Sequence, residues 1–112
     1  MRIIVKATNI NLTPAINAFV EEKISSIGDI ISAHQNESAI ARVEIGKPSK
    51  HHHSGAVFRS EVNFKIGGDL FRAEASHEDL YAAINLTKDE IVRQINKHKT
   101  KSVSARRKLR KS

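Results

Sequence analysis

Alternating apolar and polar residues predict four strands in this chain, because successive side chains of a strand point to opposite faces of a sheet. The alternation covers residues 2–8, 41–45, 58–66 and 71–75. Apolar residues gather on one side of each segment, and most of the charged residues lie on the other. Between the last two segments, Gly67-Gly68 offers two positive-φ positions for a tight hairpin. We therefore expect a sheet that is antiparallel in this hairpin and covered by helices on one face only.

Apolar residues spaced three or four positions apart predict two helices. The first begins after Thr13, whose hydroxyl caps it, with Pro14 in its first turn. It extends to about residue 32, although Gly28 weakens its last turn by roughly 1 kcal/mol relative to alanine. The second begins at Ser76, which forms a capping box with Asp79, and ends near residue 99. Its inner stripe consists of Leu80, Ala83, Ile84, Thr87, Ile91 and Ile95.

The resulting order, β-α-β-β-β-α, belongs to the α+β class, with a four-stranded sheet and two helices packed on one face. At 112 residues, we expect one domain that buries roughly 60 to 65% of its unfolded surface. No apolar run approaches the roughly 18 residues of a membrane span, and the N-terminus lacks the apolar region and cleavage site of a signal peptide. We expect a cytoplasmic protein with no membrane partner. Since the chain has no cysteine, disulfides, thiolate metal sites and cysteine nucleophiles are excluded.

Positive charge is concentrated at the C-terminal end. Residues 1–96 carry 11 Lys and Arg against 12 Asp and Glu, so this part is nearly neutral. Residues 97–112 contain no acid and eight cations: Lys97, Lys99, Lys101, Arg106, Arg107, Lys108, Arg110 and Lys111. This distribution favours a polyanionic partner, with nucleic acid or the ribosome ahead of a membrane surface. The alternative is a solvated end that only aids solubility. We expect a domain over residues 1–101 and a basic tail over 102–112 that is disordered unless a partner orders it.

Three sequence blocks resemble the ribosome hibernation-promoting factor family, also known as ribosome-associated translation inhibitors or ribosomal subunit interface proteins. They are Leu12-Thr13-Pro14-Ala15-Ile16, Glu78-Asp79-Leu80-Tyr81-Ala82-Ala83-Ile84 and Arg93-Gln94-Ile95. The resemblance covers residues 1 to about 101 and is to the short form of the family. Longer members carry a further C-terminal domain that joins two ribosomes. Because this chain ends at Ser112, the resemblance implies that ribosome pairing needs another factor or does not occur.

The resemblance implies a non-catalytic protein with no cofactor, metal or small-molecule substrate. It implies binding to the small ribosomal subunit, with its 16S-type rRNA, in the channel used by messenger and transfer RNA. Such binding silences ribosomes in stress or stationary phase, and the protein is a monomer off the ribosome. Family members resemble double-stranded RNA-binding domains, which read the phosphate and 2′-OH pattern of folded RNA. From charge alone, a general RNA-binding or RNA-chaperone module acting through the tail stays open, as does a structural domain with an inert tail.

The resemblance assigns RNA contacts by position to Lys23, Arg93, Lys97 and Lys99. The charge pattern adds six tail residues: Lys101, Arg106, Arg107, Lys108, Arg110 and Lys111. Structural alternatives exist, since Lys97 and Lys99 can stabilise a helix C-terminus and Lys23 can pair with a carboxylate. The chain also departs from the family: Asn17 replaces a frequent arginine, Glu90 replaces a usual lysine, and Thr87 and Lys88 replace apolar residues. We therefore expect a weaker helix patch and a more important tail.

Two other groups of residues have less support as sites. The run His51-His52-His53 resembles a metal-binding tract, but consecutive residues of an extended loop cannot all face one ion. A pH-dependent RNA contact and a solvated loop are its alternatives. Glu21-Glu22 and Asp89-Glu90 are adjacent carboxylates, which diverge by about 100° on a helix and rarely form an acid-base pair. No phosphate-binding glycine loop or nucleophile-base set stands out, so we expect no enzymatic activity.

Overall fold

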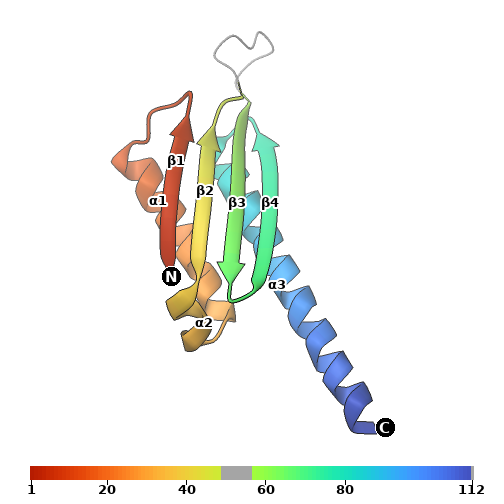
Figure 1. The fold of residues 1–112 in the computed structure, drawn as a ribbon. Coiled ribbons are helices and arrows are strands. Elements are labelled where there is room, and N and C mark those ends of the chain that lie inside the picture. The colour runs from red at the N-terminus through yellow and green to blue at the C-terminus, as the bar shows by residue number, and fades with distance from the viewer. Residues whose placement is uncertain (49–56, 112) are drawn as a thin grey trace.

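The α+β class, the four strands and two principal helices are confirmed (Figure 1). The computed structural model describes residues 1–48 and 57–111, and it describes only the backbone of residues 101–111. Its elements are β1 (Arg2–Thr8), α1 (Pro14–Ser25), the 3-10 helix η1 (Ser26–Ile30), α2 (Ala33–Ser38), β2 (Ile40–Gly46), β3 (Phe58–Ile66), β4 (Asp69–His77) and α3 (Leu80–Lys111). The histidine run at 51–53 lies outside the described residues.

The strands form one mixed sheet in the order β1-β2-β3-β4. β1 pairs with β2 in parallel, and β2–β3 and β3–β4 pair antiparallel, which confirms the expected hairpin. The helices lie behind the sheet in Figure 1 and leave its other face open, as the one-sided strand pattern predicted. Within the turn only Gly67 has a positive φ, of +56°, so the prediction of two such positions was wrong for Gly68.

The core lies between the sheet and the helices. Every member of the predicted inner stripe of α3 is buried: Leu80 is 7% exposed, Ile95 is 3% exposed and the others are fully buried. The largest fully buried side chains elsewhere in the core include Phe64 and Ile45 on the sheet and Ile24 on α1. Each fully buried side chain of this size contributes roughly 1.5 to 3 kcal/mol. Among the described residues, no helix has the length and apolar content required to cross a bilayer.

The first helix is shorter than its apolar spacing predicted. α1 ends at Ser25, and the chain continues as a 3-10 helix to Ile30. The hydroxyls of Ser25 and Ser26 donate to the carbonyls of Glu22 and Lys23, at 3.1 and 2.5 Å, and so compete with the backbone amides of an α-helix. Isoleucines spaced by three residues fit the 3-10 period as well as the α period. Periodicity alone therefore misplaced this helix end.

Helix α2 was missed by the periodicity argument because none of its residues is buried. Its signal was a capping box. The backbone amide of Gln35 donates to Ser32 Oγ at 3.0 Å, and the amide of Ser32 donates to Gln35 Oε1 at 2.9 Å. This reciprocal pair satisfies two otherwise unpaired donors at the helix start.

Helix α3 begins and ends at other residues than predicted. Ser76 still belongs to β4, and the cap is Asp79, whose Oδ1 accepts a hydrogen bond from the Tyr81 amide at 2.9 Å. At the other end the helix passes Lys99 and continues to Lys111. Residues 81–111 contain neither Gly nor Pro, and they are rich in Lys and Arg, which favour helix. The backbone of residues 102–111 is thus helical where we expected disorder.

A buried pair of hydroxyls links β3 to α3. Ser60 Oγ and Thr87 Oγ1 lie 3.0 Å apart, both residues are fully buried, and Thr87 Oγ1 also donates to the Ile84 carbonyl at 2.8 Å. The Ser60 hydroxyl therefore donates to Thr87, which explains why a threonine fits at this buried position.

Thr87→Val is expected to destabilise the fold by about 1 to 3 kcal/mol, because it leaves the buried Ser60 hydroxyl without an acceptor. Adding Ser60→Ala removes that unpaired donor, so the double variant should lose less stability than the two single variants together. Urea unfolding followed by circular dichroism measures all three. Strict additivity would show that the two hydroxyls do not interact.

Candidate nucleic-acid interface

Arg93 lies on the exposed side of α3 and is held by Glu90, one turn earlier. Its Nε and Nη2 donate to the two carboxylate oxygens of Glu90 at 2.8 and 2.6 Å, and Gln94 donates to the same carboxylate at 3.1 Å. These hydrogen bonds, chiefly from Arg93, lower the pKa of Glu90 from 4.5 to about 2. Glu90 therefore binds a predicted contact residue.

Lys97 and Lys99 follow on α3, and both side chains are exposed. Lys99 Nζ donates to the backbone carbonyl of Ile30 at the end of η1. Lys97 makes no ion pair or hydrogen bond with the described part of the chain. The six predicted contacts of the tail lie on residues 101–111 of α3, the C-terminal arm, which projects beyond the sheet in Figure 1.

Lys23 lies in the last turn of α1, beside the start of α3. Its Nζ is 5.4 Å from the centre of the Phe19 ring, and this ring meets the Tyr81 ring edge-on with centroids 4.5 Å apart. The lysine thus makes a cation–π contact, and it forms no ion pair with a carboxylate of the described residues, which was its structural alternative. Tyr81 and Arg93 are twelve residues apart on one helix, about 18 Å along its axis. Lys23 thus lies by the first part of α3, and no described contact joins it to Arg93.

Carboxylates outnumber cations on the helical side of the protein. Up to residue 99, we count on this side the described residues of the helices and of the turn before α3. Asp69 is included because its Oδ2 lies 3.3 Å from His98 Nε2 on α3. Its five cations are Lys23, Lys88, Arg93, Lys97 and Lys99. Its nine carboxylates are Glu21, Glu22, Asp29, Glu37, Asp69, Glu78, Asp79, Asp89 and Glu90. The predicted contacts of the helices thus lie in a surface of net negative charge.

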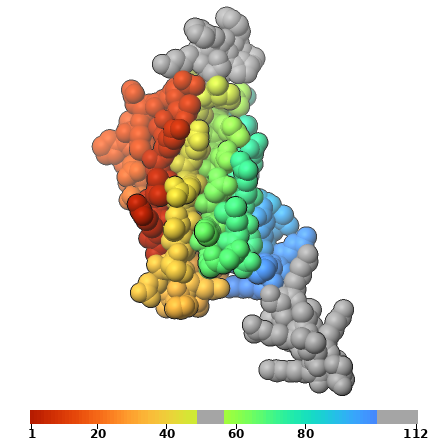
Figure 2. Space-filling view, in the orientation of Figure 1, coloured from red at the N-terminus to blue at the C-terminus, as the bar shows by residue number. Residues whose placement is uncertain are grey.

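The open face of the sheet, which faces the viewer in Figure 2, has the opposite balance. Strand alternation places six cations there: Arg2, Lys6, Arg42, Arg59, Lys65 and Arg72. Its three carboxylates, Glu44, Glu61 and Glu74, lie opposite one another in a single row across β2, β3 and β4. Sequence reasoning missed this face as a candidate site, although the charged positions of the strands indicated it.

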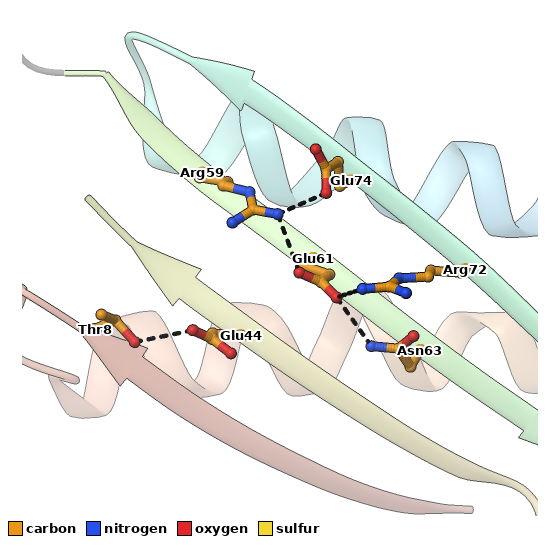
Figure 3. A network of polar contacts seen from close by, with 7 residues as sticks. All are labelled: Thr8, Glu44, Arg59, Glu61, Asn63, Arg72 and Glu74. Atoms are coloured by element: carbon orange, nitrogen blue, oxygen red, sulfur yellow. Dashed lines mark hydrogen bonds and ion pairs between the residues drawn. The ribbon is translucent and has the colours of Figure 1, made fainter. Parts of the chain in front are cut away.

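Glu61 is the centre of the polar network on this face (Figure 3). It accepts from Arg72 at 2.7 Å, from Arg59 at 3.2 Å and from the Asn63 amide at 3.3 Å. These donors, with Arg72 first, hold the pKa of Glu61 below its ordinary value. Arg59 also reaches Glu74 at 2.6 Å, which raises the pKa of Arg59. Two of the six cations thus bind Glu61 and Glu74, and Glu44 accepts a hydrogen bond from the Thr8 hydroxyl at 3.1 Å.

Metal binding finds no support in the described segments, where no three His, Asp or Glu side chains gather closely enough to hold an ion. Charge distribution is therefore the main chemical feature of the surface. The interactions that such a surface offers are ion pairs and charge-assisted hydrogen bonds to anions.

The sequence pattern as a whole matches the family described as Sigma 54 modulation protein / S30EA ribosomal protein, over residues 3–103. The chain belongs to this family. Within the S30EA family it is similar to the ribosome hibernation promoting factor of Azotobacter vinelandii, with 31% identity over 103 residues, which cover 92% of this chain and 87% of that protein. It is also similar to the ribosome hibernation promotion factor of Staphylococcus aureus (strain COL), at 30% identity over 101 residues, or 90% of this chain. The chain spans 50% of that longer relative.

Two solved structures share the fold. The N-terminal domain of Thermus thermophilus protein Y has a TM-score of 0.73 and 26% identity, covering 88% of this chain and 99% of that one. A ribosomal subunit interface protein from Coxiella burnetii has a TM-score of 0.70 at 19% identity, covering 89% of this chain and 99% of that one, and shows the fold alone. The family resemblance of the sequence blocks is confirmed. The likeness to double-stranded RNA-binding domains stays a prediction.

Proposed function

We propose that this protein binds the small ribosomal subunit in the channel used by messenger and transfer RNA. By occupying this channel, it keeps ribosomes inactive in the cytoplasm during stress or stationary phase. Membership of the S30EA family carries the proposal, with 31% identity to a ribosome hibernation promoting factor over most of both chains. The protein acts as a monomer, by binding alone, without a cofactor and without turning over a substrate.

The positions of the candidate cations on α3 support this role. Arg93 and Lys97 are exposed on one helix with the C-terminal arm, and a helix of 32 residues is about 48 Å long. The backbone that carries the cations of the arm therefore extends well past the body of the protein (Figure 1). Phosphate contacts from such residues provide affinity without sequence readout. This suits a partner recognised by the shape of folded RNA.

Sedimentation with purified ribosomal subunits at physiological salt tests the proposal. The protein is expected to pellet with the small subunit, to be displaced by messenger or transfer RNA, and to inhibit cell-free translation. Failure to pellet with the small subunit would overturn the proposal. Equal affinity for ribosomes and for any duplex RNA would instead favour the general RNA-binding module, in which the arm supplies most of the affinity.

Glu90→Gln is expected to strengthen RNA binding by about two- to fivefold, because it releases Arg93 from an exposed ion pair of modest strength. The carboxylate does not release Arg93 by itself near neutral pH, since its pKa is about 2. Fluorescence anisotropy with labelled rRNA fragments measures the affinity.

Asp89→Asn is the matched control for Glu90→Gln, since it removes the same charge from the neighbouring residue, which pairs with Lys88 at 2.6 Å. A gain that is equal in both variants would attribute the effect to net charge and not to Arg93. Loss of the gain in an Arg93→Gln background would tie the effect to that side chain.

A further inference from the structure

We propose that the open sheet face at its β3–β4 hairpin end binds RNA phosphates through Arg2, Arg42, Lys65 and Arg72. The choice of RNA as the partner rests on the proposed function. The surface itself is additional to that function, because it lies on the opposite side of the sheet from the helices and contains none of the contacts predicted from the sequence. The protein would then hold RNA on two sides.

The strand register places these four residues together. Arg42 lies opposite Asn63, which lies opposite Arg72, and the next row contains Arg2, Ile40, Lys65 and Leu70. Each strand thus supplies one cation. With neighbouring strands about 4.8 Å apart, the four side chains arise from a flat area about 15 Å wide. The face is open because no helix covers this side of the sheet (Figure 2).

The two rows contain no carboxylate. The acidic row lies two residues away along each strand. Of the four cations proposed here, only Arg72 contacts it, and the Arg72 side chain is still 67% exposed. Within the described chain, Arg2, Arg42 and Lys65 have no ion-pair partner and are exposed. A shallow depression of about 200 Å³ lies between Arg42, Lys65 and the 65% exposed Leu70. Unpaired cations around a shallow surface suit a phosphate backbone, which is recognised by charge along an extended path.

This surface is continuous with the cationic end of α3. Gln94 Nε2 donates to the Arg72 carbonyl at 2.9 Å, and His98 contacts both Asp69, at 3.3 Å, and the Phe71 ring, at 5.7 Å between centroids. The hairpin end of the sheet therefore packs against the turn of α3 that carries Lys97 and leads into the arm. One extended polyanion can contact both groups of cations, which favours RNA over a short acidic peptide.

Paired charge removals test the surface. R42Q/K65Q should weaken binding to a duplex RNA of about 16 base pairs by roughly tenfold and reduce the salt slope by about 1.4 to 1.8. K6Q/K47Q is the control, because it removes the same charge outside these two rows: Lys6 lies in the row of Glu44, Glu61 and Glu74, and Lys47 follows β2 and lies over the Phe58 ring. It should have a much smaller effect. An equal loss in both variants, or no loss in R42Q/K65Q, would overturn the proposal.

A cross-linking experiment locates the RNA directly, since the chain has no cysteine and one can be introduced for labelling. Leu70→Cys on the sheet and Leu86→Cys on α3 replace leucines that are 65% and 47% exposed. With a benzophenone label, position 70 is expected to cross-link to the duplex. Cross-linking from position 86 alone would place the RNA on the helical side and contradict the proposal.

The remaining outcomes separate this surface from its alternatives. If R42Q/K65Q abolishes self-association in analytical ultracentrifugation and leaves RNA affinity unchanged, the face binds a second copy of the chain and the proposal is wrong. Because the probe is a plain duplex, the result does not depend on ribosome binding. A protein that fails to sediment with ribosomes, yet loses duplex affinity in R42Q/K65Q, would retain this surface and exclude the proposed function.

Discussion

Gly46→Ala is expected to lower the free energy of unfolding by about 3 kcal/mol or more, a large share of the 5 to 15 kcal/mol typical of a domain. Gly46 is buried at the end of β2, where it lies opposite Thr8 of the parallel strand β1. A Cβ atom there would lie 2.8 Å from the carbonyl carbon of Thr8 and collide with its oxygen. That oxygen also accepts from the Lys47 amide at 3.1 Å. The methyl group must therefore force β1 away from β2.

Two other glycines provide controls of increasing severity. A Cβ at Gly68 meets no atom within 4 Å, and its φ is not positive, so Gly68→Ala should be nearly neutral. Gly67 is equally open but has a φ of +56°, so Gly67→Ala should cost about 1 to 2 kcal/mol through backbone conformation alone. Thermal and urea unfolding of the three variants rank them. If Gly46→Ala is no worse than Gly67→Ala, the two strands tolerate the methyl group and the explanation fails.

The sheet and core were predictable because burial leaves a period in the sequence. Alternation located all four strands, and the bounds of the third matched residues 58–66. The apolar stripe of α3 was predicted residue by residue, including Thr87, because side chains facing a sheet recur at helical spacing.

Features that burial does not determine were missed. The arm continues α3 to Lys111 without an apolar stripe, because periodicity reports which face is buried and not whether the backbone is helical. The start of α3 depends on Asp79 and on the Nδ1 of His77, which accepts from the Asp79 amide at 2.9 Å. Ser76 followed three residues later by Asp79 has the sequence pattern of a capping box, but Ser76 belongs to strand β4 and does not cap the helix.

The surroundings of the candidate contact residues were not predictable from the sequence. A family resemblance assigns an RNA contact to Lys23 and to Arg93 separately, each from its position in the sequence. It does not show which charged side chains lie near them in space. Only the fold shows that Arg93 is bound by Glu90 and that carboxylates surround the helical cations. Likewise, the sequence gives each cation of the sheet singly. The strand register is needed to show that Arg2, Arg42, Lys65 and Arg72 lie in two adjacent rows.

Removing residues 103–112 is expected to cause the largest loss of RNA affinity among these changes. It deletes five cations of the arm: Arg106, Arg107, Lys108, Arg110 and Lys111. If all five contact phosphates, the slope of log affinity against log salt should fall by about 3.5 to 4.5, and affinity near 100 mM salt should fall on the order of a hundredfold or more. The remaining domain retains the whole described core, so its thermal stability should change little.

A full-length variant with glutamine at those five positions separates charge from helix, because glutamine keeps a high helix propensity. It should match the truncation in both affinity and salt slope, since phosphate contacts require the cations and not the backbone that carries them. Were the glutamine variant to bind RNA like the intact chain while the truncation does not, the arm would act through its helical shape. If neither variant changes the salt slope, the arm contacts no phosphate, and the affinity must come from the body, where the exposed candidates are the sheet cations together with Arg93, Lys97 and Lys99.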